Sequence, residues 1–528
     1  MTREGQGIET GRAMDSFLGV SAGAVRAGWS GGGPILARWT GATAPKLRRH
    51  WRWSVAVVAL AALGLAFFPA RRALRHAAVV VPYPHELAQV SFAVSGDVIP
   101  HDAVRAAAAA AGEGEAGWQA LFSDVADVFE GVDFGFVNME TPVAPEHSHG
   151  TKPFMFDAPV ALPQALKASG IKIVSFANNH AMDQGWAGFA ETREHLRETG
   201  LLFAGTSDNA ATAFQPVFTE AHGIKVGWLG MTRWLNGNRN PDDPNAPHVN
   251  FFPYPGESGG APGADEATVL DAIKSARAQC DLLVVSIHWG IEYSPAPRPE
   301  DVDLAHKMLD AGATVVVGHH PHVFQPMETY RTQDGRTTLI FYSLGNFLSN
   351  QSRSYVDGLN PDAEGDPRDE MIGLFSAVRK DYGPAGIRVE LGHVGMLPLW
   401  EENNRNEIAS GRAKMPVIRP ILIDREIPRL QARLDELSNS AAPGQNAPGS
   451  SSPPPGSPAP TGGPQQAQTG NAAPAMALNP ELTPDQKKEF IEITDRLKLL
   501  TDRRAQILAR VGDEYVEAPP PLPGTSTK

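Results

Sequence analysis

The stretch that decides the fold is Ile171–Gly185, IKIVSFANNHAMDQG, where a short apolar run ends abruptly in asparagine and histidine. The same pattern recurs in SFAVSGDVIP (91–100), FGFVNMETP (134–142), LLVVSIHWGIEY (282–293), TVVVGHHPHVFQP (314–326) and LIFYSLGNFLSN (339–350). Apolar runs of this length and composition are typical of buried strands. Each of these strands is therefore expected to end at a residue that can bind a metal or carry a proton.

Amphipathic stretches alternate with these runs. The predicted strands are Val90–Ser95, Phe134–Asn138, Ile171–Phe176, Lys225–Gly230, Leu282–Ile287, Thr314–Val317 and Thr338–Ser343. The predicted helices include Ala161–Ser169, Trp186–Thr199, Ala264–Ala278 and Val302–Ala311. This alternation predicts an α/β domain with buried, largely parallel strands and helices on the sheet faces.

The polar residues at the strand ends form the candidate site, because the carboxyl ends of parallel strands share one rim where ligands bind. They are Asp97, Asn138, Glu140, Asn178, Asn179, His180, His288, Glu292, His319, His320, His322 and Asn346. Singly, Asp97 would be a turn or helix-cap residue and His288 a hydrogen-bonded core histidine. Together, their imidazoles, carboxylates and amide oxygens suit a divalent metal. Pro321 between His320 and His322 holds those two imidazoles in a defined relation.

Composition narrows the function class. The 528 residues carry a formal net charge of −13, which argues against a surface that binds nucleic acid. The single cysteine, Cys280, excludes an internal disulfide and a thiolate zinc site.

The N-terminal part predicts a membrane anchor. Residues 53–70, WSVAVVALAALGLAFFPA, carry no charge and have about the minimum length for a spanning helix. Basic residues flank this run on both sides, so an anchor is expected over 46–75, after a disordered cytoplasmic tail at 1–45. The expected location is the cell membrane, with a single pass and the bulk of the chain extracytoplasmic. A cleaved signal peptide is the alternative.

The C-terminal part predicts a linker, a helix and a tail. Residues 438–481 are rich in Pro, Gly, Ser and Ala and cannot bury a core. An amphipathic helix is expected within 482–515, running from Pro484 to about Val511 with Thr483 as its N-cap. Residues 516–528 are expected to be a tail. The helix either docks on its own domain or forms a short coiled coil or partner-binding helix.

The motifs SGDVIP, NMETPV, KPFMFDAP, IKIVSFANNHAMDQG, LLFAGTSDN, IHWGIEY, GHHPHVFQP and YSLGNFLSN resemble the bacterial CapA family of capsule synthesis, the poly-γ-glutamate capsule proteins. They span about residues 90–350. The resemblance implies a calcineurin-like metallophosphoesterase domain over 85–437, a four-layer αββα sandwich with its site at one sheet edge.

Carried over residue by residue, the resemblance implies metal ligands at Asp97, Asn179, His288, His320 and His322. It implies His180 as proton donor, and Glu140 stands where phosphoesterases place a bridging carboxylate. Glu292 joins these two as a candidate catalytic residue. The candidate substrate-binding residues are Asn138, Asn178, Trp289, Tyr293 and Asn346. The implied cofactor is a divalent metal such as Mn, Zn or Fe.

The first strand departs from the phosphoesterase pattern, because Ile99 stands where a second ligand, a histidine, is usual. One metal, or two with altered ligation, are both open. The first hypothesis is a metal-dependent hydrolase or transferase acting on an anionic envelope polymer such as poly-γ-glutamate. The second is a non-catalytic scaffold in a capsule synthesis and export complex. A general phosphodiesterase is the third.

Overall fold

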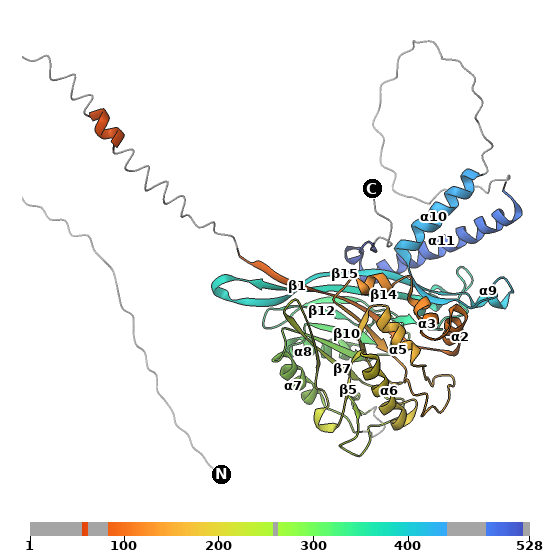
Figure 1. The fold of residues 1–528 in the computed structure, drawn as a ribbon, viewed down its shortest axis with the longest axis horizontal. Helices are drawn as coiled ribbons and strands as arrows, with labels where there is room; N and C mark the ends of the chain where they lie inside the picture. The colour runs from red at the N-terminus through yellow and green to blue at the C-terminus, as the bar shows by residue number, and fades with distance from the viewer. Residues whose placement is uncertain (1–54, 62–82, 257–261, 441–481, 521–528) are drawn as a thin grey trace, which may run out of the picture. The chain divides into compact units, whose positions relative to one another are not determined.

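One sheet of eight strands carries the first half of the site (Figure 1). Its parallel part comprises β1 (His85–Val98), β2 (Phe134–Met139), β3 (Ile171–Ser175), β4 (Leu202–Ala204) and β13 (Asn346–Leu348). Antiparallel strands extend it: β14 (Asp369–Asp381), β15 (Ile387–Asn403) and β16 (Ile418–Leu422). The parallel centre follows the predicted pattern, whereas the antiparallel flank lies beyond the residues that carried the prediction.

The second sheet has six strands and supplies the rest of the site. In spatial order they are β11 (Met327–Arg331), β12 (Thr337–Phe341), β10 (Val315–His319), β9 (Leu282–His288), β7 (Ile224–Thr232) and β6 (Val217–Ala221). The four central strands are parallel and the two edge strands antiparallel. Two short strands, β5 (Thr206–Ser207) and β8 (His248–Val249), pair separately.

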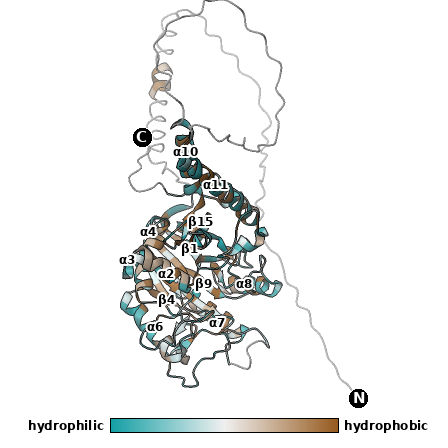
Figure 2. Ribbon diagram, turned by 90° about the vertical axis from the view of Figure 1, so that its right-hand side faces the viewer, coloured by the Kyte–Doolittle hydropathy of each residue, from teal (hydrophilic) through white to brown (hydrophobic). Residues whose placement is uncertain are grey.

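The two sheets pack face to face because successive side chains of a strand point to opposite faces. Trp228 and Val284 of the second sheet join Phe92 and Phe136 of the first in one buried core. Their neighbours in sequence, such as Leu229, face the outer helices instead. Figure 2 shows brown, hydrophobic residues along the strands and mixed faces on the helices that cover them.

Helices cover both outer faces, giving a helix–sheet–sheet–helix order (Figure 1). Against the first sheet lie α2 (Asp102–Ala111), α3 (Gly114–Phe122), α4 (Ala126–Glu130), α5 (Ala161–Ala168) and α6 (Gly185–Thr199). Against the second lie α7 (Glu266–Arg277) and α8 (Pro299–Ala311). The prediction of a mixed α/β fold is confirmed. Short elements complete this part: α9 (Arg405–Ala409), η1 (Ala210–Thr212), η2 (Asp362–Arg368) and η3 (Gly383–Ala385).

Two long C-terminal helices lie side by side at one end of the first sheet (Figure 1). Helix α11 (Pro484–Val511) has the predicted bounds, and η4 (Asp513–Tyr515) follows it. It starts with a capping box in which Thr483 and Gln486 each bond the other's backbone N–H. Its Leu500 and Ile507 are buried against the sheet, so the helix docks on its own domain.

Helix α10 (Ile423–Ser440) was not predicted and continues three residues past the expected domain end at 437. Pro428 within it is a residue that usually breaks helices, which hid the pattern. Its Leu434 and Leu437 pack against Phe490 of α11.

The computed structural model describes residues 55–61, 83–256, 262–440 and 482–520. The predicted tail 1–45, most of the predicted anchor 46–75 and nearly all of the linker 438–481 lie outside these ranges. Among the described residues, no helix combines the length and apolarity that a membrane crossing requires.

Candidate metal centre

Strand register brings the polar strand ends together. Asp97 of β1 lies opposite Asn138 of β2 on one side and Asn346 of β13 on the other. In the second sheet His288 of β9 lies opposite His319 of β10. Parallel pairing brings the strand ends of each sheet to one edge, and the 3.3 Å between His319 Nδ1 and Asp97 Oδ1 shows that the two edges meet.

The centre of the cluster is Glu140. Its carboxylate is fully buried, and its Oε1 has no hydrogen-bond partner. Three imidazoles point their Nε2 atoms toward this oxygen: His288 at 3.7 Å, His180 at 3.9 Å and His322 at 4.0 Å. These distances exceed hydrogen-bond length but leave room for a small ion between oxygen and nitrogens.

Asp97 anchors the other side of the cluster. Its Oδ1 accepts a hydrogen bond from the Asn138 amide at 2.8 Å, and its Oδ2 lies 3.2 Å from Nδ1 of His322. The Nδ1 of His319 is 3.3 Å from Oδ1, close but not aligned as a hydrogen bond. Burial works to raise the pKa of Asp97, but His319 and His322 outweigh it and hold the pKa well below its usual range.

Burial shifts the pKa values of the neighbouring groups. Burial, reinforced by the negative charge of Asp97, raises the pKa of Glu140 well above its usual range. Burial, with His320 beside it, lowers the pKa of His288 well below its ordinary value. Burial, with His322 beside it, lowers the pKa of His320 to about 3. The imidazoles of His288 and His320 are therefore neutral at pH 7 and keep a lone pair for a cation.

The backbone of the His-Pro-His turn adopts a strained conformation at both histidines. His320 has φ = 98° and His322 has φ = 58°, a region that non-glycine residues rarely occupy. Nδ1 of His320 is also buried without a hydrogen-bond partner. Strained residues with unused polar atoms concentrate at functional sites, which favours a ligand role for this turn.

His180 is oriented as the predicted proton donor would be. Its Nδ1 lies 2.8 Å from Oδ2 of Asp183, and its ring packs against Phe156. An imidazole that donates its Nδ1–H to a carboxylate presents Nε2 to its other side. That side faces Glu140 and a hollow of about 650 Å³, which Asn179 and Glu292 also line.

The asparagines hold the other groups in place. Asn179 points its Oδ1 at Nε2 of His288, 2.8 Å away, so these two predicted ligands face each other. Asn178 donates to Asn138 and to the Met139 carbonyl. Asn138, Asn178 and Asn346 are completely buried and hydrogen-bonded. This placement favours a positioning role over the predicted contact with substrate.

Trp289, Glu292 and Tyr293, the three residues predicted from the motif HWGIEY, lie in different environments. Glu292 lies at the smaller hollow, and Tyr293 is half exposed beside a larger hollow of about 1000 Å³. Burial, with Glu292 beside it, raises the pKa of Tyr293 to about 12. The prediction that Trp289 binds substrate is wrong. Its side chain is 1% exposed in the core under α7 and α8, and its indole N–H donates to the Tyr342 carbonyl. It cannot reach a substrate from there.

Several residues that shape the candidate centre had no role predicted from the sequence. His319 is fully buried with both ring nitrogens unpartnered, and only its place in GHHPH signalled it. Asp183 orients His180, and Asn236 accepts from Asn179 at 3.3 Å. His101 accepts from the Asn350 backbone at 3.2 Å, and burial, with His322 nearby, lowers its pKa to about 4.

The donor set fits a divalent cation. Ligand atoms of Asp97, Glu140 and His288 lie within 4.8 Å of one another, as do those of Glu140, His320 and His322. Glu140 belongs to both groups, so the cluster offers room for one ion or for two that share this carboxylate. Its unpartnered buried oxygen is the feature that a bound cation would satisfy.

Comparisons with known proteins point to a capsule synthesis family. Residues 91–351 match the family described as "Bacterial capsule synthesis protein PGA_cap". "Capsule biosynthesis protein CapA" of Bacillus anthracis is 31% identical over 235 residues, 44% of this chain and 54% of that protein. "PGA biosynthesis protein CapA" of Bacillus subtilis is 31% identical over 238 residues, 44% of this chain and 58% of that protein. The chain thus spans little more than half the length of these relatives.

Among solved structures, Haemophilus influenzae NAD nucleotidase is 11% identical with a TM-score of 0.34, over 60% of this chain and 53% of that one. A hypothetical protein from Thermus thermophilus is 16% identical with a TM-score of 0.29, over 58% of this chain and 99% of that one. Every predicted metal ligand lies within the family match, and through residues 91–351 the chain belongs to the bacterial capsule synthesis protein family PGA_cap.

Proposed function

We propose that this protein is a divalent-metal-dependent hydrolase or transferase that acts on an anionic envelope polymer in capsule or poly-γ-glutamate biosynthesis. The observation that carries the proposal is the unpartnered Glu140 oxygen, buried among the Nε2 atoms of His180, His288 and His322. The polymer class comes from the capsule and PGA biosynthesis names of the Bacillus relatives.

Asp97, Glu140, His288, His320 and His322 would hold the ion, with Asn179 beside His288. A divalent cation bound there would polarise the scissile carbonyl or phosphoryl group and lower the pKa of a bound water. His180, held by Asp183 and lining the smaller hollow, would deliver a proton from Nε2 to the leaving group. Glu292 at the rim of that hollow would contact the substrate.

The larger hollow offers space for the polymer on the other side of Phe154 and Met155, which line both hollows. It carries charges of both signs: Lys152 and Arg353, and the carboxylates of Asp102 and Glu364. Its lining alone does not select an anion, so a bound cation would supply the main attraction for substrate carboxylates.

The test compares full-length wild type with His180→Gln on poly-γ-glutamate, peptidoglycan fragments and a phosphoester, after loading with Mn²⁺ or Zn²⁺. We expect wild type to cleave an envelope polymer and the variant to lose about 10²–10⁴-fold in rate while keeping its metal. Metal-loaded wild type that cleaves none of the substrates would refute the catalytic proposal. Cleavage of the phosphoester alone would favour a general phosphodiesterase.

A non-catalytic accessory role is the second candidate. A Mycobacterium tuberculosis relative, 25% identical over 215 residues, bears the name "Probable polyglutamine synthesis accessory protein". In this role the cluster would bind metal or polymer within a synthesis and export complex. His180→Gln would then still support polymer export in cells, whereas the catalytic proposal requires a defect.

The membrane location is part of the proposal and rests on the uncharged run 53–70 with its basic flanks. We expect the full-length protein in the membrane fraction, with residues 85–440 accessible to protease added outside. Replacing Val57 and Leu60 by Lys should release it from the membrane. Membrane recovery that is unchanged by this substitution would contradict an anchor at 46–75.

A further inference from the structure

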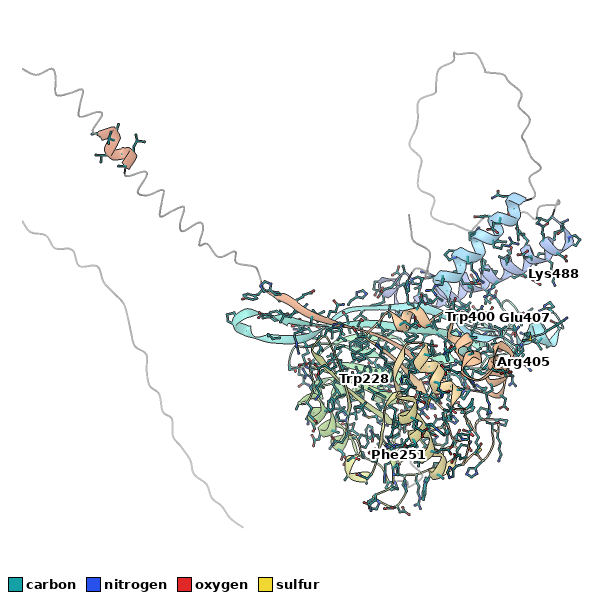
Figure 3. All side chains as sticks on the ribbon, viewed as in Figure 1. Trp228, Phe251, Trp400, Arg405, Glu407 and Lys488 are labelled. Carbon is teal, nitrogen blue, oxygen red and sulfur yellow. The ribbon has the colours of Figure 1, made fainter. Side chains whose placement is uncertain are left out.

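Helix α11 inserts one arginine into the domain that carries the site. The Arg503 side chain is fully buried, and its Nε lies 2.8 Å from Oδ1 of Asp369. Its Nη2 lies 2.9 Å from Oδ1 of Asp366, and its Nη1 donates to the Asp362 carbonyl at 2.8 Å. The guanidinium also lies 5.6 Å from the ring of Trp400, which Figure 3 labels beneath the C-terminal helices. Arg503 therefore contacts η2 at its start, through the Asp362 carbonyl, and just after its end, through Asp369.

Element η2 is a wall of the larger hollow and a support of the candidate centre. Ala363, Glu364, Asp366 and Pro367 line that hollow. The Pro367 carbonyl accepts a hydrogen bond from Nδ2 of Asn346 at 2.8 Å. The same amide nitrogen lies 3.1 Å from Gln351 Oε1. The nitrogen also lies 3.3 Å from the His322 carbonyl oxygen, so these acceptors hold the Asn346 amide with its oxygen toward the His322 ring.

That oxygen meets a candidate ligand. Oδ1 of Asn346 lies 3.2 Å from Nδ1 of His322, and Asp97 Oδ2 lies 3.2 Å from the same nitrogen. A proton on Nδ1, shared with these two acceptors, leaves the Nε2 lone pair facing Glu140. Partners of this kind fix the ring orientation of a metal-binding histidine, and their loss typically weakens metal binding about 10–100-fold.

We infer that Arg503 is a positioning residue for the candidate centre. Arg503 of α11 fixes η2 through its ion pairs, and the Pro367 carbonyl of η2 fixes the Asn346 amide, which orients the His322 ring. The C-terminal helix then completes the site from beyond the capsule synthesis family match, which ends at residue 351. The link between α11 and His322 stands on its own contacts, and its effect on metal binding rests on the proposed function.

The neighbouring residue supplies a matched control. Arg504 also forms an ion pair from α11, but its partner is Asp424 of α10, away from η2. Arg504→Met therefore removes a comparable contact without touching the path to His322. Arg503→Lys keeps the charge but cannot reproduce the forked contacts, so it provides a milder change than Arg503→Met if the latter folds poorly.

The experiment measures two quantities on full-length protein: amide hydrogen exchange without metal, and Mn²⁺ affinity. We expect Arg503→Lys to speed exchange at 362–369 and also at 320–324 and 345–351, and to weaken Mn²⁺ binding about 10-fold. Arg504→Met should speed exchange only near 423–430 and leave Mn²⁺ affinity unchanged. Faster exchange confined to 362–369 in the Arg503 variant would overturn the inference.

A double substitution separates this inference from a merely structural role. If Arg503 acts through Asn346, adding Arg503→Lys to Asn346→Ala should weaken Mn²⁺ binding no further, although it still lowers stability. Fully additive losses would mean that no such path exists. A wild type that binds no Mn²⁺ would defeat the proposed function, while the exchange data would still decide the link to His322.

Discussion

Two clusters of buried charge are linked through Asn346 and are built differently. Around Arg503 the charges are matched: Asp366 and Asp369 face the guanidinium, and Arg510 adds a second cation to Asp366. Around Glu140 they are not, since its Oε1 has no partner and its neighbours are imidazoles. Burial and Asp97 raise the pKa of Glu140 and so favour its neutral form, whereas a bound cation would supply the counter-charge that the ionised carboxylate lacks. Charge balance thus distinguishes the Arg503 cluster, which stabilises the fold, from the Glu140 cluster, which is suited to binding a cation.

The largest effect should come from breaking the matched cluster. Arg503→Met leaves Asp366 and Asp369 buried beside only Arg510, and removing one partner of a buried ion pair typically costs about 3–5 kcal/mol. Urea unfolding of the metal-free protein should show a loss of this size. A loss below about 1 kcal/mol would mean that Arg503 does not compensate these carboxylates.

Replacing Glu140 should have the opposite effect: little or no loss of stability, but a large loss of metal affinity. Glu140→Gln replaces a buried carboxyl group whose Oε1 has no partner, so the metal-free protein should be as stable as wild type or more so. Metal affinity should fall by about 100-fold or more, because a bound ion would lose a ligand. Unfolding curves with EDTA and with excess Mn²⁺ check both expectations. Clear destabilisation in EDTA would contradict the idea of an uncompensated charge.

A third buried cluster should produce a pH dependence. Burial raises the pKa of Glu401 from its ordinary 4.5 to about 8, although Ser349 donates two hydrogen bonds to it. Because the folded pKa is the higher one, its stabilising effect is fully present below about pH 4.5 and is lost as pH rises toward 8. Glu401→Gln should flatten this decline, by roughly 3–4 kcal/mol between pH 5 and pH 8.

Unfolding of wild type and Glu401→Gln across that pH range provides the measurement. Glu115→Gln, at an exposed position in α3, serves as the control and should leave the profile unchanged. Identical pH profiles for all three proteins would rule out Glu401 as the titrating group.

The smallest effect concerns the start of α11. Thr483→Ala removes the side-chain acceptor for the Gln486 N–H and should cost about 1 kcal/mol. Since α11 carries Arg503, this variant should also exchange slightly faster at 362–369. Lys488→Ala, on the exposed surface of the same helix, should change stability by less than about 0.5 kcal/mol. Equal losses for both variants would show that the cap contributes nothing.

Local signals predicted the part of the fold that builds the site. The apolar run at Ile171–Ser175 and the polar residues after it give strand, turn and candidate donors from spacing alone. Helix α11 was equally readable from Thr483 and Pro484. These features depend on contacts near in sequence, which a pattern can carry.

Features that depend on distant contacts could not be read in this way. Trp289 sits beside His288 in sequence but faces the opposite side, because adjacent strand-end residues point in opposite directions. Arg503 looked like one more polar residue of a helix until its partners, more than 130 residues earlier in the chain, were in place. The role of Asn346 likewise depends on Pro367 and His322, which only the fold brings together.

The measurement that tests the central claim most directly is the metal content of full-length wild type and of His320→Ala/His322→Ala, by elemental analysis after purification with added Mn²⁺ or Zn²⁺. The charge imbalance at Glu140 predicts one or two equivalents of divalent metal in wild type and their loss in the double variant. No metal in wild type, or equal metal in both proteins, would contradict a metal centre at this rim.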